Sequence, residues 1–348
     1  MRFLRLLPLS LAALLVPAIA LAHEVYVLPK DVIAHDLTMP PLQVFDIITA
    51  HTGQFFFWMF ICMWAIFTIL AISISKPIER HISPLLDRLK PYAPLVARLT
   101  LGVAITASGY FGALFGPELP LADFLHPVSA HAATILLIVC GTLITAGLFT
   151  RISAAILMLF YLMMWQHYGT YMLTYLNYFG EMTITLIVGN ATFALDKYFH
   201  HLYPHMIHNI VAWLEKHSFL LLRVAFGSSL IYASMYAKLI HAQLAIDTVT
   251  RYNLTNYFPF DPGFIVLGAF CIELLLGLFF VFGIEVRFAS LFLLFWLTLS
   301  LLYFGEAVWP HIILAGAAIA IFMHGYDKYT LQFGLMRMRY KGMHEPTL

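Results

Sequence analysis

Ionisable side chains occur at a few positions of an otherwise apolar chain, and these residues are the first candidates for chemistry. The triplet Phe-Gly-Glu occurs at 179–181 and again at 304–306, and Lys238 and Glu273 lie within apolar stretches. A lone charge near the centre of a membrane helix costs at least about 2.5–3.5 kcal/mol on insertion scales, so opposite charges there favour mutual neutralisation. We therefore expect Lys238 and Glu273 to pair. We expect Glu181 in the interior and Glu306 at the rim.

Helix geometry places the strongest candidates at one level of the bundle. An α-helix rises about 1.5 Å per residue, so Lys238, Glu273, Glu181 and His311 each lie roughly 21–24 Å from the Arg or Asp at the other end of their helix. A carboxyl group that faces a bundle interior is a candidate for proton exchange or for hydrogen bonding to a quinone or similar headgroup. We predict these four as the catalytic residues of a polar pocket. A purely structural ion pair is the alternative for Lys238 and Glu273.

Histidine and aromatic residues gather near the same level. Among them we select His131, His167, Trp165 and Glu306 as candidates for cofactor binding, although part of the aromatic content belongs to the ordinary interfacial belt. Histidines on different helices, such as His131 and His311, could ligate haem, whereas c-type attachment is excluded because the sequence has no CxxCH. The cofactor is left open, with quinone ahead of copper and haem.

The start of the chain suggests a possible metal site. Removal of residues 1–22 would leave His23 with a free amine beside its ring, and His35 follows in the same polar segment. An amino-terminal histidine can chelate copper, so His23 and His35 are the metal-ligand candidates. The three cysteines show no CxxC spacing, which indicates neither a disulfide framework nor a thiolate site. Nucleotide-binding loops, HExxH and nucleophile elbows do not occur in the sequence either.

Composition defines the elements that must position these residues. Of the 348 residues, 61% are hydrophobic and only 11% are charged, and the mean hydropathy is +0.85. Such a chain is a polytopic membrane protein, and we expect an all-α bundle. Nine apolar stretches predict its helices, at roughly 52–75, 96–115, 130–149, 152–168, 179–195, 218–240, 263–283, 287–304 and 310–325.

Charge distribution indicates the orientation. Residues 1–22 combine two arginines, a short apolar run and an Ala-Leu-Ala ending, which is typical of a cleaved signal peptide, and an uncleaved first helix is the alternative. If the chain then starts in the periplasm, most Lys and Arg residues fall on cytoplasmic segments, and Lys30, Lys238 and Arg251 fall outside. We expect a multi-pass protein of a bacterial inner membrane with a cytoplasmic carboxyl terminus.

The sequence contains an internal repeat. Residues 97–114 align with 222–239, matching Arg98 to Arg223 and Gly102 to Gly227, and the pattern Gly-x5-Gly-x3-Arg recurs at 141–151 and 277–287. We expect two parallel four-helix units. The predicted order is a signal peptide 1–22, a periplasmic segment 23–51, a lead-in helix 52–75, a first unit 95–198, an amphipathic linker 199–217, a second unit 218–329 and a cytoplasmic tail 330–348.

The residues of these units resemble the DoxX-like family of four-helix membrane proteins. The resemblance rests on Arg-x3-Gly opening a helix, Lys-Leu at its end and "ELLLGLFFVFGIEVR" at 273–287. It covers roughly 218–329 better than 95–198, and the chain departs from the usual single unit. The family includes DoxD-type thiosulfate:quinone oxidoreductase subunits and a methylamine-utilisation protein, so the resemblance implies the fold more strongly than an activity.

We therefore predict a periplasmic-side polar pocket that serves a redox or quinone-linked process, as part of a larger membrane system. If the chain is an enzyme, it is a quinone-linked oxidoreductase subunit. Two alternatives remain: a transporter or periplasmic copper-handling protein, and a non-catalytic assembly or anchoring subunit. The expected partners are the lipid bilayer and other membrane or periplasmic subunits, and nothing in the charge balance points to nucleic acid.

Overall fold

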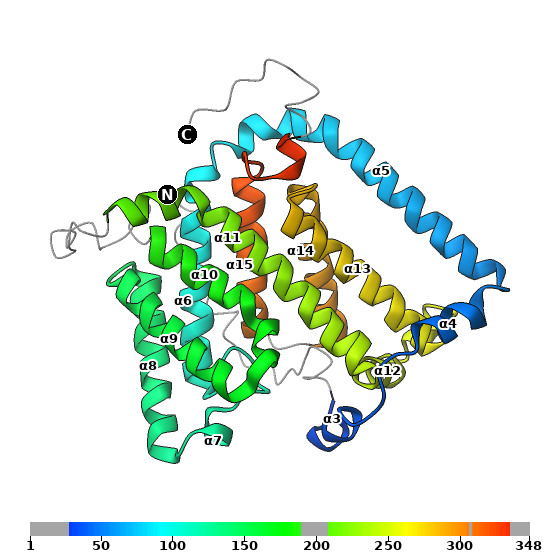
Figure 1. Cartoon of the computed structure of the whole chain (residues 1–348), viewed down its shortest axis with the longest axis horizontal. Helices are drawn as coiled ribbons and strands as arrows, with labels where there is room; N and C mark the ends of the chain where they lie inside the picture. Colours follow the sequence, from blue (N-terminus) through cyan, green and yellow to red (C-terminus); the bar gives the residue numbers. More distant parts are fainter. Residues whose placement is uncertain (1–27, 189–207, 306–307, 335–348) are drawn as a thin grey trace.

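We describe residues 28–188, 208–305 and 308–334 of a computed structural model of the chain (Figure 1). The helices are α3 (Lys30–Asp36), α4 (Val44–His51), α5 (Phe55–Leu86), α6 (Ala93–Phe111), α7 (Leu121–Phe124), α8 (Pro127–Ala146), α9 (Thr150–Tyr168), α10 (Leu176–Val188), α11 (His208–Met235), α12 (Ala242–Arg251), α13 (Pro262–Phe282), α14 (Val286–Phe304) and α15 (Val308–His324). Short turns join them: η2 (Lys90–Tyr92), η3 (Gly169–Tyr175), η7 (Tyr236–Ile240) and η8 (Leu254–Asn256). The described residues form no β-strand beyond one isolated bridge between Ala113 and Pro120, so the all-α prediction is confirmed.

Five segments are long and apolar enough to cross a membrane: Lys90–Phe111, Pro127–Ala146, Glu215–Ile240, Pro262–Phe282 and Val286–Phe304. Two shorter apolar helices, Phe57–Leu70 within α5 and Val308–His324, accompany them. Because lipid cannot satisfy backbone hydrogen bonds, helices of this length and composition are the expected membrane-spanning elements. The protein is therefore a multi-pass helical membrane protein in contact with the bilayer.

Close glycine contacts fix two equivalent helix crossings. A Cβ atom added to Gly102 of α6 would lie 2.8 Å from the carbonyl oxygen of Gly141 on α8. A Cβ atom added to Gly227 of α11 would lie 2.6 Å from the carbonyl oxygen of Gly277 on α13. Small residues let two helix backbones approach closely in membranes. The glycines that align in the sequence therefore lie at close helix crossings in both expected units.

The last helix of each expected unit packs against the first helix of the other expected unit. α10 lies along α11, where a Cβ on Gly180 would meet Ala225 Cβ at 2.9 Å. α15 lies along α6, where a Cβ on Gly316 would meet Thr100 Oγ1 at 2.0 Å. Figure 1 shows α6, α10, α11 and α15 together in the middle of the bundle, with α8 and α9 on one side and α13 and α14 on the other. The centre of the protein is thus built from both units.

Two element boundaries differ from those predicted. The lead-in helix, expected at 52–75, runs from Phe55 to Leu86 because the polar residues after 75 continue the helix. α11 begins at His208, so the second half of the expected linker 199–217 is already part of a long helix. The expected signal peptide 1–22, and the first half of that linker, lie outside the described residues.

Helix α5 is attached to the bundle at its two ends. At one end Phe57 is buried and its ring lies 5.6 Å from that of Phe264 on α13. At the other end Arg287 Nη1 donates to Ser83 Oγ at 3.0 Å, and Arg287 Nη2 lies 3.3 Å from Asp87 Oδ1. Figure 1 shows α5 slanting across the right of the view, apart from α13 and α14 along much of its length.

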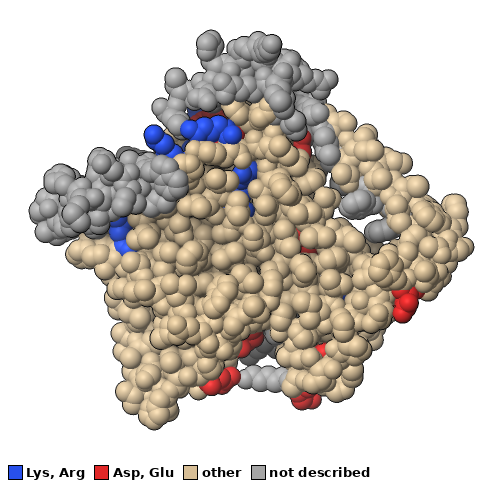
Figure 2. Space-filling model, in the orientation of Figure 1, with Lys and Arg blue, Asp and Glu red and all other residues tan. Residues whose placement is uncertain are grey.

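Charge is distributed unevenly between the ends of the molecule. On the face shown in Figure 2, the Lys and Arg side chains gather toward the end where α11 begins. Most visible Asp and Glu side chains lie toward the opposite end. The tan surface between them is broad and uncharged, as expected of a surface that faces lipid.

Candidate functional site

A cavity of about 80 Å³ lies between the two expected units. Its walls come from η3 and α10 of the first unit and from α11, η7 and α15 of the second. The lining residues are Tyr171, Thr174, Tyr175, Asn177, Tyr178, Ser229, Leu230, Ala233, Tyr236, Ala237, Pro310, His311 and Leu314. Four tyrosines and a histidine in one small cavity form a surface that combines aromatic rings with hydrogen-bonding groups.

Tyrosine rings hold one another in place around this cavity. The ring centroids of Tyr171 and Tyr236 lie 5.0 Å apart in an edge-on arrangement, and those of Tyr171 and Tyr175 lie 6.0 Å apart. The hydroxyl of buried Tyr178 donates to Phe115 O at 3.0 Å. Aromatic pairs prefer such edge-on geometry, which adds to the energy of burial. The wall is therefore a packed cluster rather than a set of independent side chains.

Two polar side chains join the helices beside the tyrosines. Ser229 Oγ lies 2.6 Å from Thr174 O, to which it donates, and 3.1 Å from Asn177 Oδ1. Asn177 and Ser229 are both 2% exposed, so their hydrogen-bonding capacity is directed inside the protein. They tie α11 to η3 and α10 at the cavity.

Lys238 and Glu273 form the predicted ion pair. Lys238 Nζ lies 3.0 Å from Glu273 Oε2, and the Lys238 side chain is almost fully buried. Lys238 belongs to the π-helical turn η7, which directs Tyr236 and Ala237 to the cavity and brings Lys238 to α13. Turns of this type inside α-helices are frequent at functional sites. The pairing prediction is confirmed, and the pair adjoins the cavity through η7.

Glu181 occupies the predicted interior position. Its side chain has no exposed surface, and Thr100 Oγ1 lies 3.4 Å from its Oε2 atom. It follows the cavity residues Asn177 and Tyr178 by one helical turn on α10. His311 is also buried and lines the cavity itself. These two predicted residues thus lie within and next to the cavity.

The other candidates lie elsewhere. His131 on α8 and His167 on α9 are exposed, and Trp165 is partly buried against the core of the first unit, with its ring 6.3 Å from that of Tyr161. None of these three lines the cavity. Glu306 lies outside the described residues.

Of the two metal-ligand candidates near the amino terminus, the structure describes only His35. His35 is on α3, mostly exposed, and its Nδ1 lies 3.3 Å from Asp36 Oδ1, whereas His23 lies outside the described residues. Burial, opposed by the hydrogen bond to His35, raises the pKa of Asp36 above its ordinary value. Within residues 28–188, 208–305 and 308–334, no group of three or more His, Cys, Asp or Glu side chains could hold a metal ion.

Several cavity residues escaped the sequence analysis. Tyr236, Asn177 and Ser229 are ordinary residue types in apolar helices, and only the helix packing reveals that they meet. Glu118 follows a Phe-Gly pair in Phe115-Gly116-Pro117-Glu118, as Glu181 and Glu306 do in the two Phe-Gly-Glu triplets. The Glu118 carboxylate acts electrostatically on Tyr171 and Tyr178, which places its charge near the tyrosine wall.

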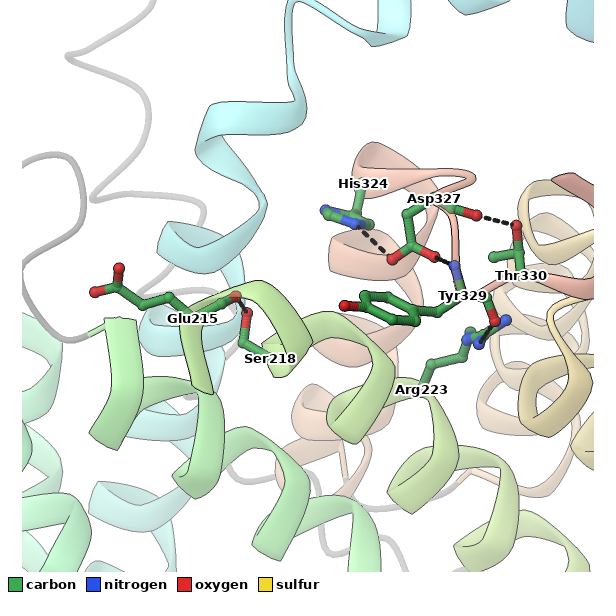
Figure 3. A network of polar contacts seen from close by, with 7 residues as sticks. All are labelled: Glu215, Ser218, Arg223, His324, Asp327, Tyr329 and Thr330. Atoms are coloured by element: carbon green, nitrogen blue, oxygen red, sulfur yellow. Dashed lines mark hydrogen bonds and ion pairs between the residues drawn. The ribbon is translucent and has the colours of Figure 1, made fainter. Parts of the chain in front are cut away.

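A second polar network joins α15 to α11 at the opposite end of the bundle (Figure 3). Asp327 Oδ1 accepts from Tyr329 N at 2.9 Å, and Asp327 Oδ2 lies 3.4 Å from His324 Nε2. Arg223 Nη2 donates to Tyr329 O at 2.9 Å, and the Tyr329 hydroxyl lies 2.9 Å from His217 Nε2. The Asp-Lys-Tyr sequence at 327–329 therefore anchors the end of the second unit.

Comparison with known proteins gives a family match, and it lies within the expected second unit, 218–329. No curated protein and no solved structure matches the chain. Residues 218–306 match the family model described as DoxX, which spans α11 from Ser218 through α14. This part of the chain is therefore similar to the DoxX family over residues 218–306.

Proposed function

We propose that this protein is an inner-membrane subunit of a quinone-linked redox process, and that the cavity between its units binds a quinone-type headgroup. One observation carries the proposal: four tyrosines and His311 converge on a cavity of about 80 Å³ inside a membrane bundle. Quinones are small aromatic-like rings with two carbonyl oxygens, so they suit a site with ring faces and hydrogen-bond donors.

The size of the cavity limits what can enter it. About 80 Å³ corresponds to the liquid volume of roughly two or three waters, and an apolar cavity near 150 Å³ is known to hold benzene. A single ring could therefore occupy the cavity only after a small rearrangement, and any isoprenoid tail would remain outside. Tyr171 and Tyr236 are the residues whose side chains would hold the ring.

Polar residues supply the orientation of such a ring. The His311 ring and the Tyr236 hydroxyl, both of which line the cavity, would bind its carbonyl oxygens. Lys238 adjoins the cavity through η7, and its ion pair with Glu273 holds this turn in place. We assign Lys238 and Glu273 the role of positioning Tyr236 and place Glu181 beneath the cavity as a buried carboxyl group.

The proposal also includes a tandem duplication of the unit and an orientation in the membrane. The two close glycine crossings and the reciprocal packing of α10 on α11 and α15 on α6 support a tandem duplication of a DoxX-like unit. The unequal charge of the two ends supports an orientation with the cavity toward the periplasm and the carboxyl terminus in the cytoplasm. Electron exchange would then involve a membrane or periplasmic partner subunit.

Quinone binding to the purified protein tests the proposal. A short-chain quinone is titrated into detergent-solubilised protein while tryptophan fluorescence is recorded, because quinones quench nearby indole rings. Tyr236→Phe removes one hydrogen bond of about 0.5–1.5 kcal/mol, so the Kd should rise roughly 2- to 10-fold. Tyr110→Phe is the matched control, because Tyr110 is 76% exposed and does not line the cavity. Equal affinities of the wild-type protein and both variants would reject the site.

A further inference from the structure

The centre of the bundle contains a carboxyl group that has no charged partner within residues 28–188, 208–305 and 308–334. Glu181 has no exposed surface, its Oε2 atom lies 3.4 Å from Thr100 Oγ1, and its Oε1 atom has no hydrogen-bond partner among these described residues. It lies where α10 packs against α6, α11 and α15. Moving an isolated carboxylate from water into such surroundings is very unfavourable. The ionised form of Glu181 therefore needs a positive charge at this position.

Thr185 provides a second unused oxygen on the same helix face. Residues four apart on an α-helix are neighbours, so Thr185 follows Glu181 by one turn. Thr185 is 2% exposed, and its Oγ1 atom has no hydrogen-bond partner in the part of the chain that the structure describes. Thr183 on the same helix behaves differently, because its hydroxyl donates to Phe179 O at 2.7 Å. The Thr185 hydroxyl thus remains available for a group bound near Glu181.

Two arginines on the surrounding helices are engaged at other places. Arg151 on α9 donates to Ile187 O at 3.1 Å, and Arg223 on α11 donates to Tyr329 O at 2.9 Å. The titratable groups on the helices around the site include Arg98 on α6, Arg151 on α9, Tyr178 on α10, Arg223 on α11 and His311 on α15. Thr100 is the partner that the Glu181 carboxyl group contacts.

We infer that Glu181, Thr185 and Thr100 form a binding site for one small monovalent cation, either a proton or Na⁺. A single carboxylate balances a single positive charge, whereas a divalent ion would leave the buried site charged. Carboxylate and hydroxyl oxygens are hard ligands that suit such an ion. This inference is independent of quinone binding, because the site lies one turn away from the cavity and none of its three side chains lines the cavity.

Sodium dependence provides the first measurement. The full-length protein is unfolded thermally in detergent at increasing NaCl, with choline chloride keeping the ionic strength constant. If Na⁺ binds the folded state, stability rises as RT ln(1 + [Na⁺]/Kd), by about 2.7 kcal/mol at 100 times Kd. Glu181→Gln should abolish the response and Thr185→Val should weaken it. Thr183→Val, which changes a threonine that donates to its own helix backbone, should leave it unchanged.

The pH dependence of the infrared spectrum distinguishes a proton from Na⁺. If the cation is a proton, no Na⁺ response appears, and a neutral-carboxyl band should fade as pH rises while the protein stays folded. Thr185→Val should shift this band in an otherwise intact protein, so the assignment does not depend on Glu181→Gln folding. A protein with neither a Na⁺ response nor a pH-dependent carboxyl band overturns the inference, because Glu181 would then be a permanently neutral structural group. Quinone affinity is measured separately, and neither its presence nor its absence changes the conclusion about cation binding at Glu181.

Discussion

Lys238 Nζ lies 3.0 Å from Glu273 Oε2, and this contact joins η7 of the second unit to the middle of α13. The pair is absent from the equivalent place in the first unit, where the aligned residues are Ala113 and Leu137. Both charges are thus present together in one unit and replaced together in the other. That pattern is expected when either charge alone is unfavourable.

Lys238→Met should be more destabilising than the double variant Lys238→Met/Glu273→Gln. Removing one partner of a buried pair leaves an uncompensated charge, which costs about 3–5 kcal/mol in dry sites and less here because the Glu273 side chain is 21% exposed. Unfolding in detergent with increasing denaturant measures the stability of the wild-type protein, the two single variants Lys238→Met and Glu273→Gln, and the double variant. Lys216→Met changes an exposed lysine and serves as the control. Additive losses in the double variant would contradict the pairing energy.

Gly277→Ala and Gly141→Ala should destabilise the protein to a similar extent. An added Cβ on Gly277 would lie 2.5 Å from Ile231 Cγ1 and 2.8 Å from Gly227 O, and one on Gly141 would lie 2.5 Å from Thr106 N. Forcing a methyl group into such contacts typically costs about 1–3 kcal/mol. The free energy of unfolding checks this, with Gly334→Ala as control because nothing lies within 4 Å of its added Cβ. A loss in only one of the two units would show that their crossings are not equivalent.

Asp327→Asn should destabilise the protein at neutral pH and have less effect in acid. Burial opposes ionisation of Asp327, but hydrogen bonds from His324 and Tyr329 N and the charges of His324 and Arg223 outweigh it and lower the pKa of the carboxyl group. Because the folded-state pKa is lowered, this stabilisation is present above the unfolded value, about 3.9, and is lost as pH falls through the folded value.

The measurement is the stability of wild-type protein and Asp327→Asn across pH. We expect a loss of about 1–3 kcal/mol at pH 7 that shrinks below about pH 4. Asp123→Asn is the control, because Asp123 is exposed. A difference between the proteins that is independent of pH would attribute the effect to packing of the network in Figure 3 rather than to charge.

The sequence predicted the helices more reliably than the cavity, for physical reasons. Hydropathy is a local property, so the stretches at 130–149 and 263–283 closely matched α8 and α13. The pairing of Lys238 with Glu273 followed from the cost of a lone charge in lipid. Tyr171 and Tyr236 belong to segments far apart in the chain, and nothing local shows that their rings meet. The turn η7 also has no sequence signal that separates it from an α-helix.

Tyr178→Phe should destabilise the first unit by about 0.5–1.5 kcal/mol, the net value of one hydrogen bond. The hydroxyl of Tyr178 donates to Phe115 O, and Phe115 has the positive φ of 40° that is unusual for a residue other than glycine. This bond therefore holds the loop after α6 against α10. Thermal unfolding compares the variant with Tyr110→Phe, whose hydroxyl is on an exposed side chain. Equal melting temperatures would show that the loop conformation needs no such bond.

Arg287→Gln should detach one end of α5 from the bundle. The guanidinium group donates from Nε to Phe322 O at 3.1 Å and from Nη1 to Ser83 Oγ at 3.0 Å, and Nη2 lies 3.3 Å from Asp87 Oδ1. A neutral, shorter amide cannot maintain these contacts to α15 and α5 together. The native Cys62 on α5 and Cys271 on α13 are exposed, whereas Cys140 is buried, so spin labels on the two exposed thiols report the separation of the helices. The distance distribution should broaden in Arg287→Gln and stay narrow in Arg251→Gln, which changes an exposed arginine on α12. A narrow, unchanged distribution in both variants would mean that the contacts near Phe57 alone fix the position of α5.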